Sequence, residues 1–290
     1  EAPVFATSHS RLLPETATGF HVSSGEFEGL SLEAGHFTAY NNRASTNSDD
    51  ELLLNYGANE IGDSIAYAGG TYAFSDDLSV TLYGSKFEET WNQYYLNTNY
   101  NIALADDQSL NFDLNLYQTN DTGDSLQGDI DNTTFSLAAV YSLGYHSFLA
   151  AYQDVDGDTP FDYVGGDSIF LANSMQYSDF NGANEQSWRV GYTYDWTGLG
   201  VAGLTTSVTY VEGSNIDGTD ADVNGGYAGL QGNNGEHHET DIDIKYVFQD
   251  GPAKDLSIRL RQAFHYANTD QGEGDLHEFR VIMDYPLDVL

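Results

Sequence analysis

The feature of this sequence that most limits its fold is a two-residue alternation of apolar and polar side chains, which recurs along almost the whole chain. Residues 256–267 are an example, with apolar Leu256, Ile258, Leu260, Phe264 and Tyr266 interleaved with polar Ser257, Arg259, Arg261 and His265. Residues 109–119, 187–196 and 241–249 follow the same rule. Successive side chains point to opposite faces of a strand. The sequence therefore predicts an all-β protein whose strands have one apolar and one polar face.

Counting these segments gives about thirteen strands, many of ten residues or more. We expect them near residues 18–27, 30–38, 64–75, 77–89, 92–104, 108–119, 133–143, 146–154, 187–196, 203–212, 237–249, 255–267 and 277–290. Strands of globular sheets usually have about five or six residues, whereas a tilted bilayer crossing takes about nine to eleven. The strand lengths thus favour a transmembrane antiparallel β-barrel.

The connections between the predicted strands alternate between short turns and long polar segments. The long segments are residues 40–63, 120–132, 155–186, 213–236 and 268–276, and one short connection near residues 89–92 breaks the alternation. Successive connections of an antiparallel sheet leave opposite rims, so the long loops gather on one rim, as in outer-membrane barrels. These five segments hold 22 of the 45 acidic residues and one base, Arg43, which predicts an acidic rim.

Charge and composition exclude several classes of function. The 290 residues carry a formal net charge of −36, with 45 acidic against 9 basic residues, whereas nucleic-acid binding requires a basic surface. The sequence has no cysteine, which excludes a disulfide framework, cysteine-ligated zinc, iron–sulfur clusters and thiol catalysis. No stretch approaches the roughly 20 apolar residues of a membrane-spanning helix. A membrane role therefore has to rely on strands.

Motif searches predict no enzyme, no cofactor and no metal site. The acidic run at residues 154–158 has glycine at its fourth position, whereas a calcium-binding EF-hand loop needs glycine at the sixth. His237 and His238 are neighbours on a predicted strand, so their side chains point to opposite faces. The Gly-x-Ser-x-Gly elbow of many hydrolases does not occur.

The alternation alone is also compatible with a soluble acidic β-barrel or β-sandwich that binds cations or partners through its charged loops. A sandwich, however, would show Greek-key spacing and many strands of about five or six residues. The polar faces here combine Tyr, Asn, Asp and Arg, which suits a water-filled lumen. We therefore favour the membrane barrel over the soluble alternative.

Several longer stretches resemble the OprD family of substrate-specific outer-membrane channels. They are residues 10–20 (SRLLPETATGF), 26–30 (EFEGL), 33–37 (EAGHF), 94–97 (YYLN), 166–182 (GDSIFLANSMQYSDFNG), 251–257 (GPAKDLS), 259–263 (RLRQA), 267–275 (ANTDQGEGD) and 284–287 (DYPL). These stretches follow one another in order along essentially the whole chain.

The resemblance implies an eighteen-stranded barrel in the outer membrane of a Gram-negative bacterium. Residues 1–290 would be a single, partial barrel domain that lacks five N-terminal strands. The resemblance also implies a monomer or weak homotrimer surrounded by outer-membrane lipid. Its expected function is passive, selective uptake of small carboxylate-bearing solutes such as amino acids, with carbapenem antibiotics as further passengers.

In that family, a row of basic side chains climbs the inner wall of the pore. Arg259, Arg261 and Arg280 match this basic ladder, Lys245 is assigned to it, and Arg11 matches an arginine of the third external loop. Strand alternation independently turns Lys245, Arg259 and Arg261 toward the polar face. A carboxylate that loses water in a narrow pore needs charged donors, and the planar arginine fork suits it well.

Residues 155–186 resemble the family loop that folds inward and helps to line the constriction. Its candidate substrate-contacting residues are Tyr163, Ser174, Tyr177 and Asp179, with Asp179 pairing with a substrate ammonium group while the ladder holds the carboxylate. The alternative interpretation is that these side chains only fix the loop by hydrogen bonding.

Overall fold

The computed structural model describes residues 2–8, 13–43, 45–52, 54–58, 61–166 and 168–286. The strands are β1 (Thr16–Phe27), β2 (Leu30–Asn41), β3 (Ile65–Ala73), β4 (Leu78–Phe87), β5 (Trp91–Ala105), β6 (Gln108–Asp121), β7 (Asp131–Leu143), β8 (His146–Asp156), β9 (Gln186–Asp195), β10 (Leu204–Ile216), β11 (Gly235–Val247), β12 (Ser257–Ala267) and β13 (Leu276–Asp284). A short 3-10 helix, η1 (Trp196–Leu199), follows β9. All thirteen predicted strands are confirmed, although the last ends at Asp284 rather than near residue 290.

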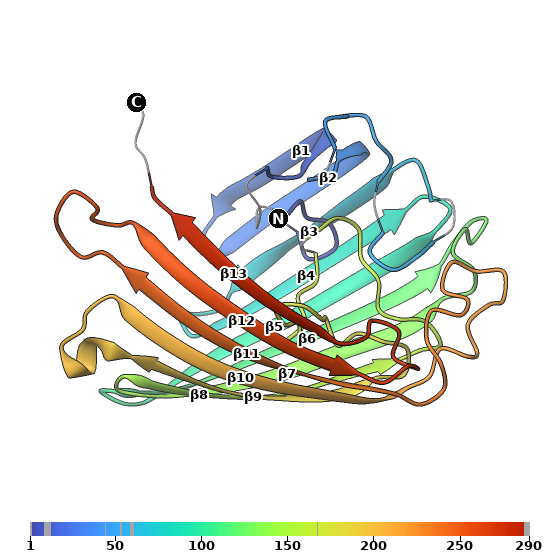
Figure 1. Ribbon diagram of the computed structural model, residues 1–290. Helices are drawn as coiled ribbons and strands as arrows, with labels where there is room; N and C mark the ends of the chain where they lie inside the picture. The colour runs from blue at the N-terminus through green and yellow to red at the C-terminus, as the bar shows by residue number, and fades with distance from the viewer. Residues whose placement is uncertain are drawn as a thin grey trace.

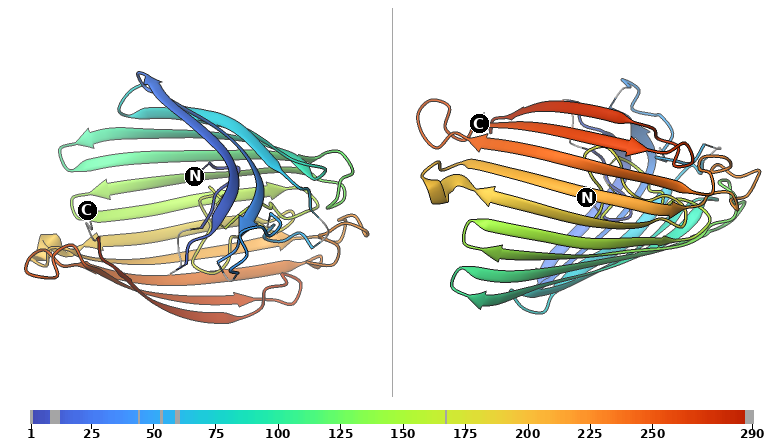
Figure 2. Two further views of the ribbon diagram at one scale, coloured as in Figure 1. Left: turned by 90° about the horizontal axis from the view of Figure 1, so that it is seen from above. Right: turned by 60° about the horizontal axis from the view of Figure 1, so that its bottom comes forward.

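The thirteen strands form one antiparallel sheet in which every strand pairs with its neighbours in sequence. Figure 1 shows that the sheet is strongly curved, so that its concave face encloses a trough. In the described part of the chain, β1 and β13 are the two edges of this sheet. Figure 2 shows the same curvature from above, with coil segments lying inside the trough.

The connections leave the sheet at two rims of different character. Residues 28–29, 74–77, 106–107 and 144–145 form short turns at one rim, while residues 42–64, 122–130, 157–185, 217–234 and 268–275 form long loops at the other. Residues 88–90 are the one short connection at the long-loop rim. Gly29 (φ 72°) and Gly144 (φ 54°) supply the positive φ that two-residue hairpin turns require. Residues 196–203 and 248–256 also connect strands at the short-turn rim but are about as long as residues 122–130 and 268–275. The predicted alternation is therefore confirmed for the other connections, whereas the tight turn expected at residues 250–252 is a longer connection.

The convex face of the sheet is apolar. Large exposed side chains occupy alternate positions of the strands, among them Leu82, Tyr94, Leu137, Trp188, Val190, Val208, Ile242, Ile244, Phe279, Val281 and Met283. Water would disfavour such a continuous apolar surface, whereas a lipid environment favours it. No helix in the described residues is long and apolar enough to cross a membrane.

A small apolar core lies inside the trough, toward the long-loop rim. Wall residues such as Trp91 and Tyr117 are buried there against loop residues such as Phe161 and Val164. The rings of Tyr117 and Phe161 lie 4.6 Å apart, and an isolated bridge joins Leu54 to Val164. Burying each such side chain contributes roughly 1.5–3 kcal/mol, so this packing holds residues 157–185 against the inner wall.

Candidate functional site

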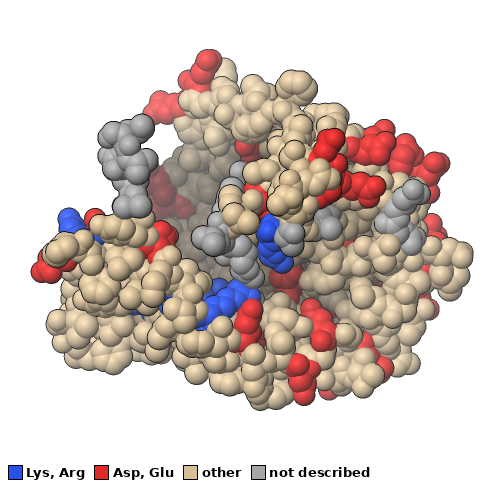
Figure 3. Space-filling model, turned by 45° about the horizontal axis from the view of Figure 1, so that its top comes forward, with Lys and Arg blue, Asp and Glu red and all other residues tan. Residues whose placement is uncertain are grey.

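Four of the basic side chains named above lie together on the concave face of the last three strands. In the register of β11 and β12, Lys245 is opposite Arg259 and Asp243 is opposite Arg261. Arg261 is in turn opposite Arg280 of β13. Residues opposite one another in a sheet share a face, so the register forms one continuous charged surface. Figure 3 shows basic side chains at the wall of the hollow and acidic ones around the rim.

Acidic side chains hold the ladder in place without covering it. Asp243 Oδ2 lies 2.6 Å from Arg259 Nη2 and 3.2 Å from Arg261 Nε, and Asp241 Oδ2 lies 4.0 Å from Arg261 Nη2. The Arg259 side chain is still 40% exposed, and Lys245 is exposed as well. An acid between two bases offsets their mutual repulsion, which allows the bases to stand side by side.

Arg280 also contacts the backbone of the segment 157–185, which the alternation does not indicate. Its Nη2 donates to the carbonyl oxygen of Gln176 at 2.9 Å, and the same nitrogen lies 2.5 Å from Glu278 Oε2. Arg280 therefore fastens the segment 157–185 to the wall as well as adding charge to it. Arg11, the fifth basic residue predicted for the site, lies outside the described residues.

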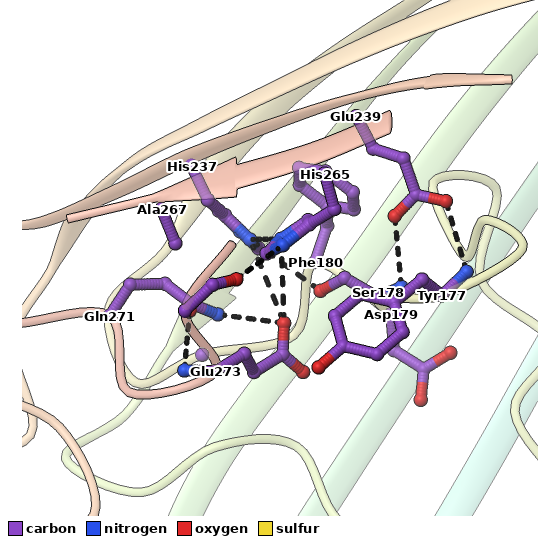
Figure 4. Close-up of polar contacts among 12 residues, drawn as sticks. Tyr177, Ser178, Asp179, Phe180, His237, Glu239, His265, Ala267, Gln271 and Glu273 are labelled. Carbon is purple, nitrogen blue, oxygen red and sulfur yellow. Dashed lines mark hydrogen bonds and ion pairs between the residues drawn. The ribbon is translucent and has the colours of Figure 1, made fainter. Parts of the chain in front are cut away.

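The segment 157–185 lies inside the trough (Figure 2), and its stretch from Ala172 to Ser178 is attached to the wall mainly through its backbone. The N–H groups of Tyr177 and Ser178 donate to the two carboxylate oxygens of Glu239, at 2.9 and 3.0 Å. The N–H group of Gln176 donates to Asp241 Oδ2 at 3.1 Å. Figure 4 shows the Glu239 contacts beside a histidine cluster. Acids of β11 thus set the position of the segment.

Three of the four candidate residues of the segment meet at one carboxylate. Asp179 Oδ2 accepts hydrogen bonds from the hydroxyls of Tyr163 (2.7 Å) and Tyr56 (2.8 Å), and Asp179 Oδ1 accepts one from the Ser174 hydroxyl (2.6 Å). Tyr177 instead packs its ring 4.9 Å from that of His265. The structure thus brings Tyr163, Ser174 and Asp179 together and places Tyr177 against the wall.

Asp162 is a buried carboxylate that the sequence analysis did not single out. It is 4% exposed and accepts hydrogen bonds from the N–H groups of residues 55–57 and of Tyr163, and from the Tyr227 hydroxyl at 3.1 Å. Burial raises the pKa of Asp162 to about 6, although the backbone donors act to lower it. This one side chain joins three of the long loops.

Arg189 is the second residue that the sequence analysis missed. Its Nη1 donates to the carbonyl oxygens of Ala172 (2.5 Å) and Ser174 (3.5 Å), and its charge interacts with Asp241 and Glu239. The alternation around Arg189 places its side chain on the polar face of the strand, and this pattern could have marked it as a residue of the pore wall. Nothing in the spacing indicates that its partners are backbone carbonyls of a segment about fifteen residues earlier.

The wall across the trough from the ladder is polar but not basic. On β5 and β6, Asp113 Oδ1 accepts hydrogen bonds from the side-chain amides of Asn97 (2.7 Å) and Asn99 (3.1 Å), and Asp113 Oδ2 accepts one from Asn115 (2.9 Å). These residues border a hollow of about 450 Å³, which is also lined by Tyr83 and by residues 170–172. The trough therefore has a basic wall and an amide-rich wall with a carboxylate.

An apolar convex face and a charged concave face define the wall of a transmembrane pore. Residues 1–289 match the family described as outer membrane porin, OprD family. Porin D of Pseudomonas aeruginosa is 56% identical over 300 residues, which cover all of this chain and 68% of Porin D. The porin-like protein GalP of Pseudomonas putida is 30% identical over 291 residues, which cover 99% of this chain and 66% of GalP. The chain belongs to the OprD family.

Solved structures agree with this assignment. The crystal structure of Pseudomonas aeruginosa OprD aligns with all of this chain and 74% of its own, at 56% identity and a TM-score of 0.92. That of Pseudomonas aeruginosa OccD3 (OpdP) aligns with all of this chain and 72% of its own, at 40% identity and a TM-score of 0.94. The protein is thus a channel of the outer membrane whose strands form a β-barrel wall, and it is neither an enzyme nor a soluble β protein.

Proposed function

We propose that this porin admits small solutes carrying a carboxylate, such as amino acids, by passive diffusion along the basic ladder. The observation that carries the proposal is the placement of Lys245, Arg259 and Arg261 side by side on the concave wall. Two charged guanidinium groups and an ammonium group supply successive hydrogen-bond donors as a carboxylate loses water. Several exchangeable partners bind the solute strongly enough to enter and weakly enough to leave.

The opposite wall supports passage of zwitterions. Asp113 and the amide groups of Asn97 and Asn99 offer acceptors to an ammonium group while the ladder attracts the carboxylate. Asp179 offers a second carboxylate in the segment between the walls, although three hydroxyl groups already donate to it. Opposite charges on opposing walls orient an amino acid across the pore and lower the electrostatic barrier to its passage.

The ladder is tested by removing two of its charges. In liposome swelling, R259Q/R261Q should slow uptake of a monocarboxylate by about fivefold, because each partly exposed charge contributes roughly 0.5–1 kcal/mol. Uptake of a neutral solute of equal size should change much less. The matched control is R43Q/K86Q, which removes one base from the rim and one from an outward-pointing position of β4. Equal losses for both solutes would rule out charge-specific guidance.

Asp179 is tested by removing its charge with little change in shape. We expect Asp179→Asn to weaken block of single-channel current by a basic amino acid by about threefold, since an exposed ion pair contributes under about 1 kcal/mol. Asp158→Asn is the control, because Asp158 is an exposed acid of the same segment. Unchanged block in Asp179→Asn would leave Asp179 with only its hydrogen-bonding role.

The proposed solute class contains carbapenem antibiotics, because these also carry a carboxylate. Assembly as a monomer or weak homotrimer in outer-membrane lipid stays a prediction. The inward position of residues 157–185 supports the proposal that this segment lines the constriction.

A further inference from the structure

A compact cluster of two histidines and a glutamate lies where the loop after β12 meets the concave wall (Figure 4). His237 comes from β11, His265 from β12 and Glu273 from the loop 268–275. His237 Nδ1 lies 3.0 Å from His265 Nε2, and Glu273 Oε2 lies 3.9 Å from the first nitrogen and 3.6 Å from the second. Both histidines are buried. The two histidines therefore meet out of contact with solvent, and Glu273, whose side chain is 26% exposed, approaches them from the loop.

The hydrogen bonds around the two rings fix which nitrogens carry protons. His237 Nε2 lies 2.7 Å from Glu185 Oε1, and His265 Nδ1 lies 2.9 Å from the carbonyl oxygen of Gly274. A carboxylate and a carbonyl can only accept, so these two nitrogens donate. In the neutral rings, His237 Nδ1 and His265 Nε2 then face each other with lone pairs at 3.0 Å. Two facing lone pairs repel unless a cation lies between them.

The spacing of the three ligand atoms matches the coordination shell of a small metal ion. Bonds of about 2.0–2.1 Å to a tetrahedral zinc ion place neighbouring ligand atoms roughly 3.4 Å apart. The observed separations of 3.0, 3.6 and 3.9 Å bracket this value. Ser178 belongs to the segment 157–185, which is called the inward segment below. Its Oγ lies 3.5 Å from His237 Nδ1 and adds a further oxygen beside the cluster. Two imidazoles and one carboxylate favour zinc and similar transition metals over calcium or magnesium.

The surroundings of the cluster also suit a divalent cation. Metal-bound histidines usually donate their second nitrogen to a carboxylate or a backbone carbonyl, which is the arrangement that Glu185 and Gly274 provide. The Glu185 carboxylate fits beside Gly213, where any larger residue would collide with it. Glu185 and Glu273 together carry two negative charges, which one divalent cation balances.

We propose that His237, His265 and Glu273 form a binding site for a divalent transition-metal ion, for which Zn²⁺ is the best fit. No metal site was predicted from the sequence, because His237 and His238 are adjacent on a strand. His238 does point to the other face. The neighbour of His237 is instead His265, which lies diagonally opposite it on β12. A bound ion links β11 and β12 to the loop 268–275 and brings Ser178 of the inward segment beside it.

The test measures zinc binding by isothermal titration calorimetry. Zinc chloride alone is titrated into the full-length porin, which has been solubilised in detergent and treated with a chelator. The wild type should bind one Zn²⁺ per chain, and His265→Ala and His237→Ala should each weaken binding by about 100-fold. His238→Ala is the matched control, a histidine of the same strand on the opposite face, and should bind as the wild type does. A wild type that binds no tighter than the His237 and His265 variants, or an equal loss in His238→Ala, would overturn the proposal.

A second measurement guards against variants that fail to fold. Glu185→Gln keeps all three ligands and should weaken zinc binding by about 10-fold or more, because it removes the negative charge behind His237 while keeping an oxygen that can accept. In the unmodified protein, Co²⁺ should give the visible absorption of a four-coordinate site and lose it when zinc is added. If no such absorption forms, a proton shared between the two rings is the occupant and the metal site does not exist. Neither readout depends on solute uptake, so failure here leaves the proposed channel selectivity untouched.

Discussion

Replacing Asp162 with alanine in the full-length porin should lower its free energy of unfolding by about 3 kcal/mol at neutral pH, because each buried donor left without an acceptor costs roughly 1–3 kcal/mol. The substitution leaves the N–H groups of residues 55–57 and Tyr163 and the Tyr227 hydroxyl without their shared acceptor. Water entering the gap would recover part of this cost. Urea unfolding in detergent micelles, followed by tryptophan fluorescence, measures the loss.

The same substitution should have a pH-dependent component. Burial raises the pKa of Asp162 from 3.8 to about 6, so the folded protein binds this proton more tightly than the unfolded chain does. The group therefore adds stability as the pH falls from above 6 toward 4, and this contribution is lost as the pH rises through 6. We expect the destabilisation by Asp162→Ala to be about 1 kcal/mol larger at pH 5 than at pH 7.5.

The control for both measurements is Asp158→Ala, which removes an exposed acid of the same segment. Its effect should stay within about 0.5 kcal/mol at either pH. A loss in Asp162→Ala that does not exceed the loss in Asp158→Ala would show that the three loops are held together by other contacts. A loss that is equal at the two pH values would show that Asp162 titrates near its ordinary range.

Replacing Arg189 with alanine should raise single-channel conductance by about twofold or more, because a segment that loses its anchors opens locally at low cost. Arg189 donates to two carbonyl oxygens of the inward segment, those of Ala172 and Ser174. It also lies near Glu239 and Asp241, which hold the same segment by its N–H groups. Removing the base leaves these acids to repel each other. Planar-bilayer recordings of open-channel current give the size of the change.

Two further variants separate anchoring from charge. Arg189→Lys keeps the positive charge but has no planar fork to span two carbonyl oxygens, so its conductance should lie between those of the wild type and Arg189→Ala. Arg43→Ala removes an exposed base at the rim and should leave the conductance close to that of the wild type. If Arg189→Lys conducts as Arg189→Ala does, geometry rather than charge sets the position of the segment.

The sheet and its two faces could be predicted from the sequence because they depend on local periodicity. The side chains of β12 show this, since each second residue from Ser257 onward points into the trough. The same periodicity places Lys245, Arg259 and Arg261 on one surface once β11 and β12 are adjacent. The assignment of Arg280 to the ladder and the inward position of residues 155–186 were predicted from the resemblance to the family, because alternation alone does not indicate them.

The contacts between loops and wall could not be predicted, because they join residues far apart in the sequence. Asp162 accepts from residues 55–57, more than a hundred positions earlier, and Glu185 meets His237 from the far end of another loop. Long loops carry no periodic pattern from which their paths follow. The strand pattern correctly put His237 and His238 on opposite faces, but the neighbours of His237, His265 and Glu273, depend on the register of β12 and on the loop beyond it.

Within the segment 157–185, the stretch from Ala172 to Ser178 is held largely by its own main chain, through the N–H groups of residues 176–178 and the carbonyl oxygens of Ala172, Ser174 and Gln176. The anchoring side chains belong to the wall. Every amino acid has the same main-chain groups, so an exposed side chain of this stretch, such as that of Tyr177, can be exchanged without moving the backbone. A protein engineer could therefore alter the selectivity of this pore one position at a time within a scaffold that keeps its shape.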